Sequence, residues 1–87
     1  MRIESDQIYH IKTKENQELL VQSWHIGRNF EWNFYVLAVL QEEDKRFLNA
    51  LVQIGDMDFI QEVESKNFPL YIGWFTCPAY ADLLKGS

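Results

Sequence analysis

The run WNFYVLAVLQ at positions 32–41 constrains this chain more than any other segment. Apolar residues occupy both alternating sets of positions, which is typical of a strand that is buried on both faces. The run is too short to cross a membrane, because a spanning helix needs about 20 consecutive apolar residues. The sequence therefore predicts a central strand, and the flanking segments must supply its neighbours in a sheet.

Two segments that precede this run also predict strands. QIYHIKT (7–13) and ELLVQSWHI (18–26) alternate apolar and polar positions, and the polar turn KENQ separates them. Pairing Thr13 with Glu18 gathers most of the larger apolar side chains on one face of this hairpin. That face would carry Tyr9, Ile11, Leu20, Trp24 and Ile26. The opposite, mixed face would carry Ile8, His10, Lys12, Leu19, Val21, Ser23 and His25.

Residues 42–56 allow two interpretations. EEDK (42–45) can turn the chain into a fourth strand, RFLNALVQIGD (46–56), in a register that pairs Gln41 with Arg46 and Leu37 with Ala50. The alternative is a helix over 42–54, with the acidic residues Glu42, Glu43 and Asp44 at the positive end of its dipole. The alternation that continues through Val52 and Ile54 favours the strand.

The remaining segments complete an α+β domain. DFIQEVESK (58–66) predicts a short helix, PLYIGWFT (69–76) a fifth strand, and CPAYADLLKGS (77–87) a final short helix with Pro78 in its first turn. The element order is β-β-β-β-α-β-α. We expect one domain over residues 1–87, built from a curled antiparallel sheet of about five strands with two short helices packed on one face.

The charge distribution favours a basic protein partner over nucleic acid. The formal net charge is −5, from 13 acidic and 8 basic residues, and the excess acids lie between Glu42 and Lys66. Binding to nucleic acid depends on basic residues that neutralise phosphates. Phe30 and Trp32 flank a turn at Glu31 and are expected to be exposed anchors. The candidate partner-binding residues are Glu42, Glu43, Asp44, Asp56, Asp58, Phe30 and Trp32.

Cys77 is the only cysteine and directly precedes Pro78. A thiol at the cap of a helix can have a lowered pKa, so Cys77 is a candidate reactive thiol. A buried cysteine that packs as a small apolar residue is the interpretation we favour. A single cysteine, the polar start MRIESDQ and the absence of a long apolar run predict a cytoplasmic protein.

Aromatic residues are abundant enough to form a ligand cavity, although ordinary core packing is the interpretation we favour. The candidate cavity residues are Trp24, Tyr35, Tyr71 and Trp74, with His10 and His25 near the opening. The predicted hairpin separates the two histidines by roughly 13 Å, too far to share a metal ion. The chain has no glycine-rich phosphate loop and no metal-ligand spacing. We therefore expect neither a metal nor a cofactor.

These observations favour a small acidic interaction module without catalytic activity. It would dock a basic protein partner, as an inhibitor or immunity-type protein does, or it would bind a second copy of itself. One alternative is a small-ligand-binding protein or minor enzyme that uses the aromatic cavity. A second alternative is a structural homodimer. We expect no nucleic-acid or membrane partner.

Overall fold

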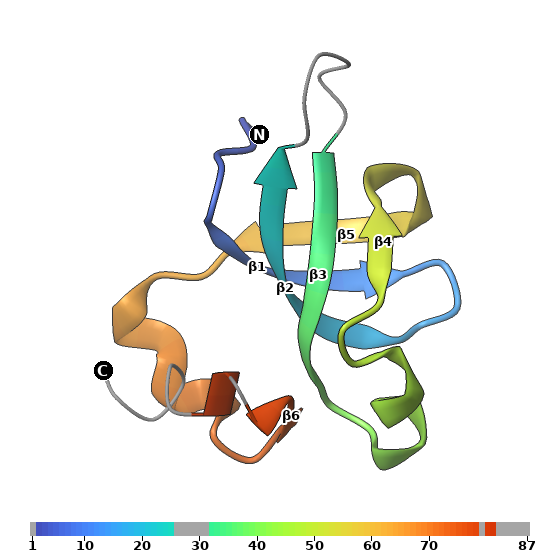
Figure 1. Cartoon of the computed structure of the whole chain (residues 1–87), viewed down its shortest axis with the longest axis vertical. Helices are drawn as coiled ribbons and strands as arrows, with labels where there is room; N and C mark the ends of the chain where they lie inside the picture. Colours follow the sequence, from blue (N-terminus) through green and yellow to red (C-terminus); the bar gives the residue numbers. More distant parts are fainter. Residues whose placement is uncertain (1, 26–31, 79, 82–87) are drawn as a thin grey trace.

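The structure, a computed structural model, describes residues 2–25, 32–78 and 80–81 as a curled antiparallel sheet with short helical segments (Figure 1). The sheet order is β4-β3-β2-β1-β5, and β6 also pairs with β3. This arrangement confirms the predicted α+β class. The strands are β1 (Ile8–Thr13), β2 (Glu18–His25), β3 (Trp32–Val39), β4 (Leu51–Gln53), β5 (Met57–Glu62) and β6 (Phe75–Thr76). The 3-10 helices are η2 (Glu42–Phe47), η3 (Ile54–Asp56) and η4 (Ser65–Tyr71).

The predicted central strand is confirmed as β3. It pairs with β2 on one side, and with β4 and β6 on the other. Its apolar residues from Val36 to Val39 are completely buried. A strand with neighbours on both sides and side chains buried on both faces needs this continuous apolar sequence.

The β1–β2 hairpin is confirmed, but its predicted register is wrong by one residue. Lys12, rather than Thr13, pairs with Glu18. The Thr13 N–H donates to the carbonyl of Gln17 at 2.9 Å, so three residues rather than four form the turn. Asn16 makes this turn possible by adopting a left-handed conformation with φ of 65°. The shift moves Leu20 to the opposite face from the one predicted, because strand side chains alternate.

The two faces of the sheet carry separate cores. We call the first the inner core, and both edge strands contribute to it: Val52 from β4, and Met57 and Ile60 from β5, pack against its buried residues. The sheet therefore curls around this face. The buried residues of the inner core are Tyr9, Ile11, Leu19, Val21, Phe34, Val36 and Val39. The outer core lies on the other face, under η4, and contains Ile8, Leu20, Leu37, Ala38, Val63, Phe68 and Tyr71.

Residues 42–56 combine parts of both interpretations. The fourth strand exists, but it is limited to β4, and the predicted start at Arg46 is wrong because η2 occupies residues 42–47. The helical alternative is correct only for residues 42–47, and the helix there is a 3-10 helix. A 3-10 helix places residues three apart on one side, and here this brings Asp44 and Phe47 towards the protein interior. Phe34 pairs with Val52, one residue away from the predicted register.

Two element predictions in the C-terminal half are wrong. Residues 57–62, predicted to lie largely in a helix, form strand β5, because β1 offers an edge for pairing and the inner core receives Met57 and Ile60. Residues 65–71, which overlap the predicted fifth strand, form η4 instead. Its three-residue period directs Phe68 and Tyr71 together into the outer core. Only Phe75 and Thr76 of the predicted strand pair with the sheet.

The final helix starts where the sequence predicts. Pro78, Tyr80 and Ala81 are helical, and Tyr80 packs against the outer core together with Trp74. The predicted helix beyond Ala81 lies outside the described residues. Within the part of the chain that the structure describes, no helix is long and apolar enough to cross a membrane.

Candidate binding surface

An aromatic pair stands on the part of the outer sheet face that lies outside the outer core. The rings of Trp24 and Tyr35 have centroids 5.5 Å apart and planes tilted by 31°. Strand pairing places the exposed Leu51 directly beside Tyr35. Trp24 keeps 41% of its surface exposed although it contacts another ring. We call Trp24, Tyr35 and Leu51 the aromatic face.

A groove of about 430 Å³ lies next to the aromatic face. Gln22 connects the two, because it lines the groove and pairs with Tyr35 across β2 and β3. Three carboxylates and no basic side chain line this groove, which we call the acidic groove. Its lining residues are Asp6, Gln7, Ile8, Gln22, Glu62, Val63, Glu64, Ser65 and Phe68.

The carboxylates of the acidic groove are open to a cationic ligand. Glu64 pairs with Lys66 at 3.2 Å, but both side chains are largely exposed. An exposed ion pair of this kind contributes at most about 1 kcal/mol, so a partner's cation can replace Lys66. Among the described residues, no group of His, Cys, Asp or Glu side chains could hold a metal ion.

His10 is the centre of a second cluster, which joins the sheet to η4. Its Nε2 atom lies 3.3 Å from Glu18 Oε1, and its Nδ1 atom lies 3.1 Å from the Tyr71 hydroxyl. A carboxylate only accepts hydrogen bonds, so Nε2–H donates to Glu18 and, in the neutral ring, Nδ1 accepts from Tyr71. Burial, and secondarily the charge of Glu18, raises the pKa of the Tyr71 hydroxyl.

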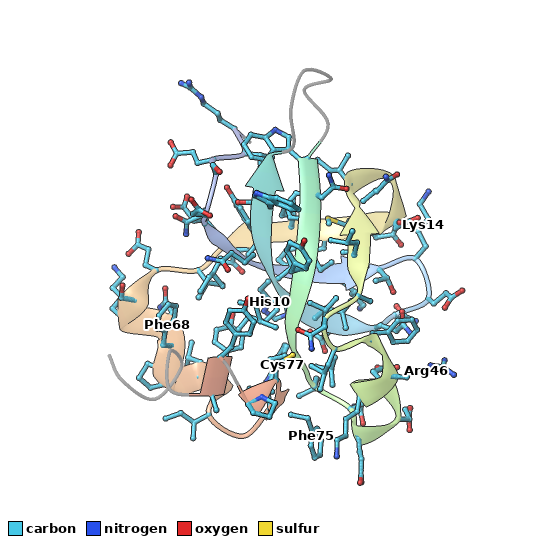
Figure 2. All side chains as sticks on the ribbon, viewed as in Figure 1. His10, Lys14, Arg46, Phe68, Phe75 and Cys77 are labelled. Carbon is cyan, nitrogen blue, oxygen red and sulfur yellow. The ribbon has the colours of Figure 1, made fainter. Side chains whose placement is uncertain are left out.

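Aromatic rings surround the imidazole of His10. The centroids of Phe59, Tyr71 and Trp74 lie 5.9, 5.6 and 5.2 Å from it, all edge-on. Figure 2 shows His10 on the side of the sheet that faces η4 and Phe68. This packing holds η4 against the sheet, because Tyr71 of η4 contacts His10 of β1.

The six candidate cavity residues separate into two groups. His10, Tyr71 and Trp74 contact one another, whereas Trp24 and Tyr35 stack with each other. His25 ends β2, and its side chain lies outside the described residues. None of the described five lines the acidic groove.

A second cavity, of about 330 Å³, opens beside the β1–β2 turn, from which Lys14 extends (Figure 2). Its floor is apolar, because Leu19, Phe47 and Val52 belong to or pack against the inner core. Its remaining lining residues are polar or charged: Thr13, Lys14, Glu15, Gln17 and Asp56. Sequence reasoning did not find this cavity, because its lining comes from the β1–β2 turn and from five separate elements, β1, β2, η2, β4 and η3.

The structure places the candidate partner-binding acids in different environments. Glu42, Glu43 and Asp58 are exposed. Asp56 is also exposed, and its carboxylate accepts the backbone N–H of Gln53 at 3.2 Å. Asp44 is only 6% exposed and accepts a hydrogen bond of 3.2 Å from Gln17 Nε2. Asp44 therefore presents almost no charge to a partner.

Of the two predicted aromatic anchors, Trp32 lies within the described residues. Trp32 is half-buried and packs against the inner core. Phe30 lies outside the described residues. The exposed tryptophan of the described chain segments is Trp24, which the hairpin register had assigned to a buried face.

Cys77 is buried, as the favoured interpretation predicts, with 2% of its surface exposed. Its thiol lies 3.3 Å from Asn49 Oδ1 and 3.8 Å from the carbonyl oxygen of Val36, close to β3 (Figure 2). Burial raises the pKa of this thiol. The shift is opposite in direction to the one that a reactive thiolate requires.

Comparisons with protein-family models, with curated proteins and with solved structures found no match for this chain. The interpretation of the surface therefore depends on its geometry. Sequence reasoning did not single out the groove carboxylates Asp6, Glu62 and Glu64. Asp6 is far from Glu62 and Glu64 along the chain, so only the pairing of β1 with β5 brings it close to them.

Proposed function

We propose that this protein is a small cytoplasmic interaction module without catalytic activity that docks a basic protein partner. An inhibitor or immunity-type role is the form of this function that we favour. The observation that carries the proposal is the aromatic face beside the acidic groove. The cytoplasmic assignment is supported by the single cysteine, which is a free, buried thiol.

The aromatic face has the features of a binding anchor. Trp and Tyr are enriched among the residues that dominate binding energy, and neighbouring exposed apolar side chains are typical of interaction sites. A stacked pair also offers ring faces to an arginine or lysine side chain through cation–π contact. The groove carboxylates would pair with neighbouring cations, and the net charge of −5 would speed the encounter with a basic partner.

The test begins with a pull-down from the native cell to identify the partner, followed by titration of purified proteins. Trp24→Ala should weaken binding at least about tenfold, which corresponds to about 1.4 kcal/mol. Leu70→Ala is the control, because Leu70 is 74% exposed but belongs neither to the aromatic face nor to the lining of the acidic groove. A specific partner with an acidic binding face, or one that binds both variants equally well, would refute the proposal.

A second candidate function is the binding of a small molecule in the cavity beside the β1–β2 turn. The volume of this cavity falls within the range of small-molecule pockets, and its apolar floor is typical of them. A ligand at about 100 times its Kd should stabilise the protein by about 2.7 kcal/mol in a thermal-shift screen. Val52→Phe, which narrows the cavity, should reduce the shift, and Trp24→Ala should leave it unchanged.

A further inference from the structure

Strand β5 is an edge of the sheet. It pairs with β1, and no other described segment pairs with its second side. Natural edge strands are protected from pairing with another chain by charged side chains, above all lysine, by proline or by β-bulges. The sequence of β5, MDFIQE, contains neither lysine nor proline, and its two charges, Asp58 and Glu62, are both negative. Its bulge lies near its start, where Thr13 pairs with Met57 and Asp58 is the extra residue, so the strand from Phe59 to Glu62 is regular.

The backbone groups that face the open side of β5 can be identified. The Val63 N–H donates to the carbonyl of Ile8 at 2.9 Å, so Val63 points its backbone towards β1. Antiparallel strands alternate between residues that bond to a given neighbour and residues that do not. Phe59 and Gln61 therefore also face β1, whereas Ile60 and Glu62 direct their N–H and C=O groups outward.

The side chains of β5 determine which strand this edge accepts. Asp58 and Glu62 are both exposed. Antiparallel pairing of two copies centred on Ile60 would set Asp58 of one copy against Glu62 of the other. Like charges directly opposite each other destabilise a sheet, whereas opposite charges stabilise it. The edge thus disfavours a second copy of this chain and favours a strand with basic residues.

We propose that the open edge of β5 binds an extended basic segment of a partner protein as an additional strand. Main-chain hydrogen bonds to Ile60 and Glu62 would supply affinity, and pairing of lysine or arginine with Asp58 and Glu62 would supply specificity. Phe59, 45% exposed, would offer an apolar contact. This inference shares Glu62 with the acidic groove of the proposed function, but its main-chain recognition uses no residue of the aromatic face.

Amide hydrogen exchange measured by NMR tests the proposal on the intact chain. The probe is a capped peptide that alternates lysine and valine over six residues, the length of β5. At saturation, the amides of Ile60 and Glu62 should gain at least about tenfold protection, since they become hydrogen-bonded. The amides of Phe59 and Gln61 are internal controls, and their protection should stay constant. Equal protection at all four positions, or none at Ile60 and Glu62, would overturn the proposal.

Two peptide controls separate backbone pairing from simple charge attraction. A peptide that alternates glutamate and valine should bind at least about threefold more weakly, because it places like charges across the strands. An N-methylated version of the lysine peptide keeps its charge but cannot form the ladder. If the N-methylated peptide binds as well as its parent, the interaction is electrostatic only, and strand addition is wrong.

Charge-neutralising variants test whether the lysine peptide binds at the carboxylates of β5. Asp58→Asn with Glu62→Gln should weaken binding of the lysine peptide about 2- to 30-fold, the range for two opposite-charge cross-strand pairs. Glu42→Gln with Glu43→Gln removes two exposed charges from η2 and is the matched control. Equal weakening by both pairs would contradict edge binding. Perturbation of Trp24 and Gln22 without β5 protection would support the aromatic face and refute this inference.

Discussion

The Tyr71 hydroxyl lies 3.1 Å from Nδ1 of His10, and this contact fastens η4 to β1. The two residues are 61 positions apart in the chain. His10 is held from its other nitrogen by Glu18, so the imidazole is fixed between the sheet and the 3-10 helix. The outer core beneath η4 therefore includes a polar link in addition to its apolar packing.

Removing this link should destabilise the protein moderately. We expect Tyr71→Phe to lower the free energy of unfolding by about 0.5–1.5 kcal/mol, the contribution of one hydrogen bond. Urea unfolding measures the change. Tyr80→Phe is the control, because Tyr80 packs against the same core without a hydroxyl contact of this kind. If both variants lose the same stability, the His10 contact contributes nothing.

The thiol of Cys77 should react slowly. Its burial and raised pKa both lower the fraction of accessible thiolate at neutral pH. The rate of alkylation by iodoacetamide at pH 7 should be below that of an unstructured cysteine peptide, and it should rise to the peptide rate in urea. A native rate above that of the peptide would support a reactive thiol.

Alkaline pH should destabilise the fold. The pKa values of Cys77 and Tyr71 lie above their ordinary values of 9.0 and 10.0. Between the ordinary and the raised pKa, the folded state binds more protons than the unfolded state, so stability falls as pH rises. These contributions are fully present below about pH 9 and are lost above it.

The pH dependence is measured by urea unfolding from pH 7 to pH 11. The double variant Cys77→Ala with Tyr71→Phe should show a smaller decrease in stability over this range than the unmodified protein. Parallel curves for the two proteins would show that neither group is linked to folding.

The buried carboxylate of Asp44 should make Gln17 important for stability. Gln17 Nε2 donates to Asp44 at 3.2 Å, and its Oε1 accepts from the Thr13 hydroxyl at 3.1 Å. Gln17→Ala should cost about 1–3 kcal/mol, because a buried acceptor loses its partner. Thermal unfolding compares it with Glu15→Ala, an exposed position in the same turn. Equal stability of the two variants would contradict this role.

Asn16 should control the register of the β1–β2 hairpin. Its φ of 65° is a left-handed conformation that glycine tolerates and β-branched residues resist. Asn16→Gly should therefore be nearly neutral, whereas Asn16→Val should cost about 1–2 kcal/mol. Chemical denaturation measures both, and cross-strand NOEs between Ile11 and Leu19 report the register. An Asn16→Val protein of unchanged stability would show that the turn does not require this conformation.

The sequence predicted β1, β2 and β3 because their signals are local. Alternation identified the first two strands, and the doubly apolar run identified β3 as central. The start of the last helix at Pro78 was also readable, since proline suits the first helical position. The burial of Cys77 followed from the ordinary behaviour of a lone cysteine.

The strand registers and the elements at the edges of the sheet were not predictable, because they depend on contacts between segments that are distant along the chain. One left-handed residue, Asn16, shortened the first turn and exchanged the faces of the β2 side chains. Residues 58–62 have a helical pattern, yet the unpaired side of β1 and the inner core made them a strand. Residues 65–71 became a 3-10 helix because Phe68 and Tyr71 enter the outer core together.

By itself, the sequence determined the fold class, the central strand and the acidic character of this protein. Tertiary structure alone decided which side chains meet. Only strand pairing brings Asp6 near Glu62, and only the true register places Trp24 beside Tyr35 on an exposed face. Composition and periodicity indicate which side chains of a segment can be buried. A binding surface depends on distances between segments, and the folded sheet determines those distances.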